Sequence, residues 1–108
     1  MTIKWVVTDP LVMNGEPFCY GTRLTVRQLL ELRRSGYGLT ELIKDHPELR
    51  RLGVAAAYTY AANNRDRYAE FFEPDGSLAG PGYSEDEAAE LPAQYRVPGI
   101  VVKVRPAA

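Results

Sequence analysis

Few side chains in this sequence have the chemistry of a catalytic centre, and their spacing does not assemble one. The chain contains one histidine, His46, and one cysteine, Cys19. A general base needs a partner that orients it, and a zinc ion needs three or four ligands, so two residues complete neither site. The sequence also lacks the motifs of serine hydrolases, phosphate-binding loops and zinc proteases. We therefore expect no enzyme and no metal or other cofactor, unless Cys19 and His46 meet in one cleft.

The acidic residues near the C-terminus suit a protein contact better than a calcium site. Ser84 and Glu87 have the spacing of a capping box, so the neighbouring carboxylates lie on a short helix whose positive end they stabilise. A calcium loop would need turn residues between its ligands, and this stretch has none. We predict that three of these acidic residues bind a partner protein: Glu85, Asp86 and Glu90.

A second group of side chains could contact DNA. Arg50 and Arg51 precede a predicted helix, at the position from which helix-turn-helix proteins reach base edges. Thr59, Asn63 and Arg65 lie further along that helix and could reach the phosphate backbone. These five residues form the candidate DNA-binding site. The alternative is that the two arginines are solvated charges in a turn.

An aromatic series continues the same segment. Tyr68, Phe71 and Phe72 recur with Tyr58 at roughly helical spacing. Such a series could stack on single-stranded nucleic acid, but the helical spacing favours burial in the core or in a dimer interface. We therefore assign Tyr68, Phe71 and Phe72 to partner binding and expect a homodimer.

The distribution of charge gives a weaker indication of partners. Residues 1–72 contain ten Lys or Arg and eight Asp or Glu, whereas residues 73–108 contain three and six. The two parts therefore carry +2 and −3, within a net charge of −1. This division favours nucleic acid in the first part and a protein in the second, but the small net charge argues against an unselective polyanion binder.

Local patterns predict the elements that position these residues. Alternation in residues 3–8 predicts a short strand, and residues 18–20 predict a second strand that returns as a hairpin. The next turn is Gly21-Thr22-Arg23, in which we expect the Thr22 hydroxyl to close the turn and Arg23 to brace it internally.

Three helices follow in order. Thr25 and Gln28 form a capping box that begins the first helix, and Gly36 ends it. The second helix begins at or near Thr40, and Pro47 stops it.

The third helix is predicted from near Leu52 toward Phe71, with an inner stripe at i, i+3, i+4 and i+7. The stripe consists of Val54, Ala57, Tyr58 and Ala61. After a loop rich in glycine and proline and the short acidic helix, residues 100–104 predict a strand that pairs with the N-terminal one.

This order of elements is typical of a helix-turn-helix. We predict a mainly α fold, a three-helix helix-turn-helix bundle with a small N-terminal β element and a C-terminal strand. Residues 1–72 would form the helix-turn-helix-like domain, and residues 73–108 would add a loop, a short acidic helix and the strand. No apolar run approaches the roughly 20 residues of a membrane span, so we expect a cytoplasmic protein without membrane contact.

These patterns together resemble a known bacterial family. The matching positions are Asp9-Pro10, Gly15, Pro17, Gly21-Thr22-Arg23, Val26, Leu30, Gly36, Pro47, Leu49, Val54 and Tyr60. Over about residues 3–68 the chain is similar to the family filed as domain of unknown function 433. The resemblance implies a trihelical module and an antitoxin-like partner of PIN-type ribonuclease toxins, in the manner of the VapB antitoxins. The chain departs from the family at residues 50–53, where Arg-Arg-Leu-Gly replaces the usual acidic helix cap.

Two functions follow as expectations. The first is a DNA-binding antitoxin-like transcriptional regulator, a homodimer that binds operator DNA and neutralises a cognate PIN-type toxin. The second is a protein-interaction or oligomerisation module without DNA binding. Arg50, Arg51 and the helix order favour the first, and the net charge of −1 favours the second.

Overall fold

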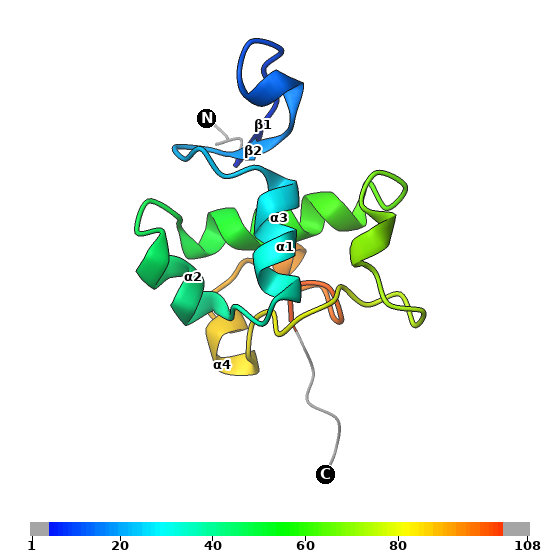
Figure 1. The fold of residues 1–108 in the computed structure, drawn as a ribbon. Coiled ribbons are helices and arrows are strands. Elements are labelled where there is room, and N and C mark those ends of the chain that lie inside the picture. Colours follow the sequence, from blue (N-terminus) through cyan, green and yellow to red (C-terminus); the bar gives the residue numbers. More distant parts are fainter. Residues whose placement is uncertain (1–4, 103–108) are drawn as a thin grey trace.

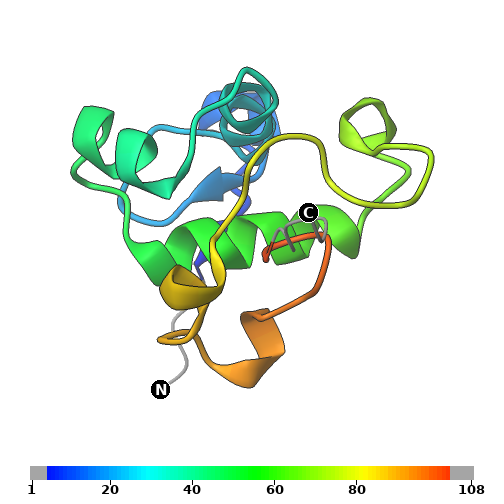
Figure 2. The same ribbon diagram turned by 90° about the horizontal axis from the view of Figure 1, so that it is seen from below.

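The central element of the computed structural model, which describes residues 5–102, is the helix α3 (Arg51–Ala62). The helix α1 (Val26–Arg34) crosses α3 on one side (Figure 1). A 3-10 helix, η3 (Ala93–Tyr95), lies on the opposite side of α3 (Figure 2). Because other elements cover α3 from both sides, the core of the domain forms around it.

The predicted N-terminal hairpin is confirmed, with shorter strands than expected. β1 (Val6–Val7) and β2 (Phe18–Cys19) are antiparallel, and Val6 faces Cys19 in the register. The connection includes the 3-10 turn η1 (Met13–Gly15), where Asn14 and Gly15 take positive φ angles of 56° and 78°. We call residues 5–25 the hairpin lobe, and Figure 1 shows its strands and turn standing above α1 and α3.

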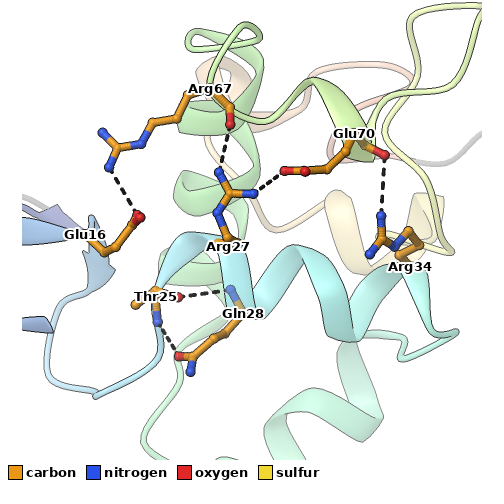
Figure 3. A network of polar contacts seen from close by, with 7 residues as sticks. All are labelled: Glu16, Thr25, Arg27, Gln28, Arg34, Arg67 and Glu70. Carbon is orange, nitrogen blue, oxygen red and sulfur yellow. Dashed lines mark hydrogen bonds and ion pairs between the residues drawn. The ribbon is translucent and has the colours of Figure 1, made fainter. Parts of the chain in front are cut away.

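The capping box of α1 forms as predicted. The Thr25 hydroxyl accepts a hydrogen bond from the Gln28 amide at 3.0 Å, and the Gln28 side chain accepts one from the Thr25 amide at 2.9 Å (Figure 3). These two contacts satisfy amides that have no partner within the helix. Beyond the other end of α1, Gly36 has φ 105°, the left-handed conformation predicted for it. Local sequence therefore sets both ends of this helix.

Of the two helices that follow, the first begins near Thr40 and stops before Pro47 as predicted, whereas the second does not reach its predicted end. α2 (Leu39–Asp45) has Gly38 rather than Thr40 as its N-cap, and it ends before Pro47. The prediction that the third helix runs toward Phe71 is wrong, because α3 ends at Ala62. Beyond it the Asn64 side chain donates to the Tyr60 carbonyl at 2.8 Å, competing for a backbone group that a longer helix would use. The chain then turns into a short 3-10 helix, η2 (Ala69–Phe71).

The predicted inner stripe of α3 is buried, and so are further small residues around the helix. The buried set is Gly53, Val54, Ala55, Ala56, Ala57, Tyr58 and Ala61. Small side chains allow neighbouring elements to approach closely. At Gly53, for example, a β-carbon would lie 3.3 Å from the Trp5 ring.

The predicted fold class is wrong. Residues 5–102 form four α-helices and a two-stranded antiparallel sheet, not a three-helix helix-turn-helix bundle closed by a C-terminal strand. The fourth helix is α4 (Glu85–Ala88), which has the predicted capping box between Ser84 and Glu87.

The expected C-terminal strand is replaced by a turn. The Val97 carbonyl accepts hydrogen bonds from the amides of Ile100, Val101 and Val102, so these amides are not available to a strand partner. Ile100 and Val101 are both buried, without the alternation of a half-buried strand. The rest of the predicted strand, residues 103–104, lies outside the described residues.

The segment of residues 78–102, here called the C-terminal segment, closes over α1 through a buried arginine. Arg33 is fully buried and donates to the carbonyls of Ile100 and Leu78, the latter at 3.2 Å. Its guanidinium lies 4.5 Å from the centre of the Tyr58 ring. Burial lowers the pKa of Arg33, because desolvation disfavours the charged form. Residues of the two predicted parts, 1–72 and 73–108, thus share one core.

Across the described range, residues 5–102, no helix combines the length and the apolar character that crossing a membrane would require.

Candidate functional site

The two residues predicted to read DNA from the start of α3 are both exposed, and one of them contacts the C-terminal segment. The Arg51 guanidinium lies 3.7 Å from the Glu90 carboxylate, and the Arg51 carbonyl accepts a hydrogen bond from the Tyr83 hydroxyl. Arg50 is the extended N-cap residue of α3, and its side chain is exposed. Of the two arginines, only Arg50 is thus left without an ion pair to another described residue.

The other three predicted DNA contacts lie at the far end of α3. Thr59 donates its hydroxyl proton to the Ala55 carbonyl at 2.9 Å. Arg65 donates to the Gly76 carbonyl at 3.1 Å, and its guanidinium stacks on Phe72 at 4.6 Å. Twelve helical residues span about 18 Å, so these residues and the two arginines at the helix start do not form one compact surface.

The arginines of α1 and of the loop after α3 are held by internal contacts (Figure 3). Arg27 pairs with Glu70 and donates to the Arg67 carbonyl at 2.8 Å. Arg67 in turn pairs with Glu16 of the hairpin lobe at 3.1 Å. Arg34 approaches the Glu70 carbonyl at 3.5 Å. This network ties the lobe and η2 to α1, and it neutralises positive charge that DNA phosphates would otherwise meet.

The residues predicted for partner binding are divided between the core and the surface. Tyr68 and Phe71 are buried, and Phe72 is half-buried under Arg65. Of the three acidic residues, Glu85 and Asp86 are exposed in the first turn of α4. Glu90 is exposed as well but pairs with Arg51.

The Gly21-Thr22-Arg23 turn of the lobe is built by Thr22, as predicted. The Thr22 hydroxyl donates to the Cys19 carbonyl at 2.9 Å and accepts from the Leu24 amide at 3.0 Å. The prediction that Arg23 braces this turn is wrong. Its side chain is exposed and makes no hydrogen bond or ion pair with any residue between 5 and 102.

The hairpin lobe carries the large apolar side chains that the described part of the chain leaves exposed. Leu11 is 94% exposed and Tyr20 is 59% exposed. The Leu11 amide donates to the Asp9 carboxylate at 2.9 Å, and the Val12 amide donates to the Asp9 carbonyl at 3.0 Å, so a tight turn holds Leu11 outward.

A groove of about 480 Å³ lies beside Leu11. Its lining is Leu11, Val12, Phe18, Thr22 and Arg23. The groove combines apolar walls with the free charge of Arg23. Sequence reasoning missed Leu11 and Tyr20, although an apolar residue directly after Asp-Pro, in a turn between two strands, was an available signal.

The two residues considered for catalysis lie in different environments. Cys19 is buried, and burial raises the pKa of its thiol to about 12, so it is not a nucleophile at neutral pH. His46 is partly exposed after α2, where its ring lies 3.7 Å from the Glu48 carboxylate. Within residues 5–102, no three His, Cys, Asp or Glu side chains come together as a metal site would require.

Comparison with known proteins gives one match. The family described as protein of unknown function, DUF433, matches residues 6–61. This range covers the hairpin lobe, α1, α2 and α3 almost to its end. No curated protein and no solved structure matches the chain.

Proposed function

The chain belongs to the DUF433 family, and from that premise we propose that it is a protein-interaction module, the antitoxin partner of a PIN-type ribonuclease toxin. The antitoxin role is what the sequence resemblance implies. The choice of a protein partner over DNA rests on the surface that the fold leaves open.

The observation that carries the proposal is the apolar tip of the hairpin lobe. Leu11 is almost fully exposed at the turn of the hairpin and lies beside a groove with apolar walls, so this tip offers apolar surface to a partner. Tyr20 is exposed on the same lobe but at its other end, where its amide donates to the Trp5 carbonyl. Fully burying a leucine side chain contributes about 1.5–3 kcal/mol, so a partner that covers Leu11 gains a substantial part of its affinity there.

DNA binding has less support from the same geometry. On the side opposite to α1, η3 and the C-terminal segment cover part of α3, so α3 does not present the continuous free face with which a recognition helix enters the major groove. Arg51, Arg65 and Arg67 are engaged in internal contacts. Exposed Arg50 is the observation that favours an operator-binding regulator as the second candidate.

The experiment is a binding titration with two matched double variants. A PIN-type ribonuclease from the same genome is titrated by calorimetry into the wild type, into Leu11→Ser with Tyr20→Ser, and into Arg50→Ala with Arg51→Ala. We expect the lobe variant to bind at least about tenfold more weakly, because central apolar anchors dominate interface energies. The arginine variant should bind as the wild type does and should inhibit the ribonuclease equally.

A second titration, with the promoter DNA of the chain's own gene at two salt concentrations, tests the alternative. Binding that falls steeply with salt and disappears in the arginine variant would support the regulator. If the lobe variant also retained full affinity for the ribonuclease, the proposal of a lobe-mediated protein contact would be wrong.

A further inference from the structure

A second hollow lies on the side of α3 that faces away from α1. It has a volume of about 420 Å³, which is within the range of small-molecule sites. Its walls come from three separate parts of the chain, with Trp5 just before β1, Tyr60 on α3 and Tyr95 on η3. Ala56 lies between them and is 7% exposed. A methyl group at this position leaves room that a larger side chain would fill.

Neighbouring rings hold two of the aromatic walls. Trp5 makes an edge-to-face contact with Tyr20, with ring centres 6.5 Å apart and planes at 87°. Tyr60 makes a similar contact with buried Tyr68 at 6.3 Å. Edge-to-face contacts restrict ring orientation, so these walls are preorganised to receive a flat ligand.

The polar groups of the hollow have unused hydrogen-bonding capacity. The Asn63 side chain makes no hydrogen bond with any other residue of the described range, which leaves one acceptor and two donor positions open. The backbone of Asn63 is fixed, because its main-chain N–H donates to the Thr59 carbonyl at 3.1 Å at the end of α3. The Thr59 hydroxyl donates its hydrogen bond to the Ala55 carbonyl, so it offers a ligand only acceptor lone pairs.

The remaining lining residues carry no charge, so the hollow is not built to hold phosphate or another ion. A neutral, flat ligand with adjacent donor and acceptor groups matches both the rings and the free amide. We propose that this hollow binds a nucleobase, stacked on its aromatic walls and recognised by Asn63. An asparagine amide pairs in bidentate fashion with adenine, so adenine is the preferred base.

This site is distinct from the lobe groove and does not depend on a partner protein. It also explains why Thr59 and Asn63 have the chemistry of nucleic acid contacts although the face of α3 on which they lie is not free to enter a DNA groove. The base would come either from a free nucleoside or from single-stranded RNA, since both present the same ring.

The test uses the intrinsic fluorescence of Trp5, which is the only tryptophan in the chain. Adenosine, a ten-residue poly(A) RNA and a ten-residue poly(U) RNA are titrated separately into the full chain. A base stacked on Trp5 quenches its emission, so we expect saturable quenching by an adenine ligand and weaker quenching by poly(U). Quenching by adenosine alone would identify a nucleoside site, and quenching by poly(A) only would identify a single-strand site.

Three variants make the test specific. Tyr95→Ala and Asn63→Ala should each weaken binding by about tenfold, because base stacking and bidentate pairing contribute on this scale. Gln94→Ala is the matched control, because Gln94 is exposed beside Tyr95 and does not line the hollow. Circular dichroism checks that every variant is folded. The inference is overturned if no ligand quenches Trp5 at millimolar concentration, or if Asn63→Ala and Tyr95→Ala bind as the control does.

Discussion

The hairpin lobe and the C-terminal segment use their apolar residues in opposite ways. In the C-terminal segment Leu78, Tyr83 and Val101 are buried, and the segment closes on the guanidinium of Arg33. In the lobe the tip residue Leu11 is 94% exposed although a tight turn fixes its backbone. The first region stabilises the domain, whereas the second presents apolar surface that the domain itself does not cover. The difference indicates where a partner gains binding energy and where substitutions unfold the chain.

The largest expected effect is on the closure of the C-terminal segment. Arg33→Ala removes two buried hydrogen bonds and opens a cavity. We expect the free energy of unfolding to fall by about 3–5 kcal/mol, as measured by urea denaturation. The matched control is Arg34→Ala, whose exposed side chain should contribute less than about 1 kcal/mol. Equal losses in the two variants would mean that Arg33 does not hold the segment closed.

The next effect tests how closely this segment approaches α1. Gly80 has φ 98°, and a β-carbon there would lie 2.1 Å from the Arg33 carbonyl oxygen. Gly36 has a similar φ of 105° but open space around it. Gly80→Ala should therefore destabilise by about 3 kcal/mol, and Gly36→Ala by about 1 kcal/mol from backbone strain alone. Thermal and urea unfolding of both variants measure the difference, and a difference near zero would contradict the close approach.

A smaller effect concerns the root of the lobe, where Cys19 is buried. Burial raises the pKa of this thiol from 9.0 to about 12. Between these values the folded chain keeps the thiol proton and the unfolded chain has lost it, so the stability falls as pH rises. One such group contributes a slope of about 1.4 kcal/mol per pH unit. Urea unfolding between pH 8 and 10.5 should show a shallower decline for Cys19→Ala than for the wild type. If the free energy of unfolding fell equally with pH in the two proteins, the Cys19 thiol would be open to solvent.

The smallest effect on folding is expected at the lobe tip. Leu11→Ser should change the free energy of unfolding by less than about 0.5 kcal/mol, because the side chain contacts little in the isolated chain. The same substitution is expected to weaken partner binding. A large loss of stability would show instead that the tip is part of the domain's own core.

The sequence by itself determined the features that depend on neighbours in the chain. The capping boxes at Thr25 and Ser84, the left-handed Gly36 and the N-terminal hairpin were all predictable. Each follows from hydrogen bonds or backbone angles within a few residues, and these do not depend on the rest of the fold. The family match likewise reflects positions within residues 6–61.

Tertiary structure alone decided the features that depend on distant partners. The end of α3 and the turn at residues 100–102 contradicted local patterns, because buried contacts and competing hydrogen bonds outweighed the helix and strand preferences of those segments. The hollow lined by Asn63 exists only because Trp5 and Tyr95, ninety residues apart, meet on one helix.

Arg33 lies between these two cases. The spacing that places it on the inner stripe of α1, three residues after Leu30, was visible in the sequence, but its charge predicted a position away from that stripe. The sequence did not show which groups accept hydrogen bonds from the Arg33 guanidinium. The carbonyls of Leu78 and Ile100 reach it only after the chain has folded back over α1. A buried charge is stable only where such acceptors converge, and that convergence is a property of the whole fold.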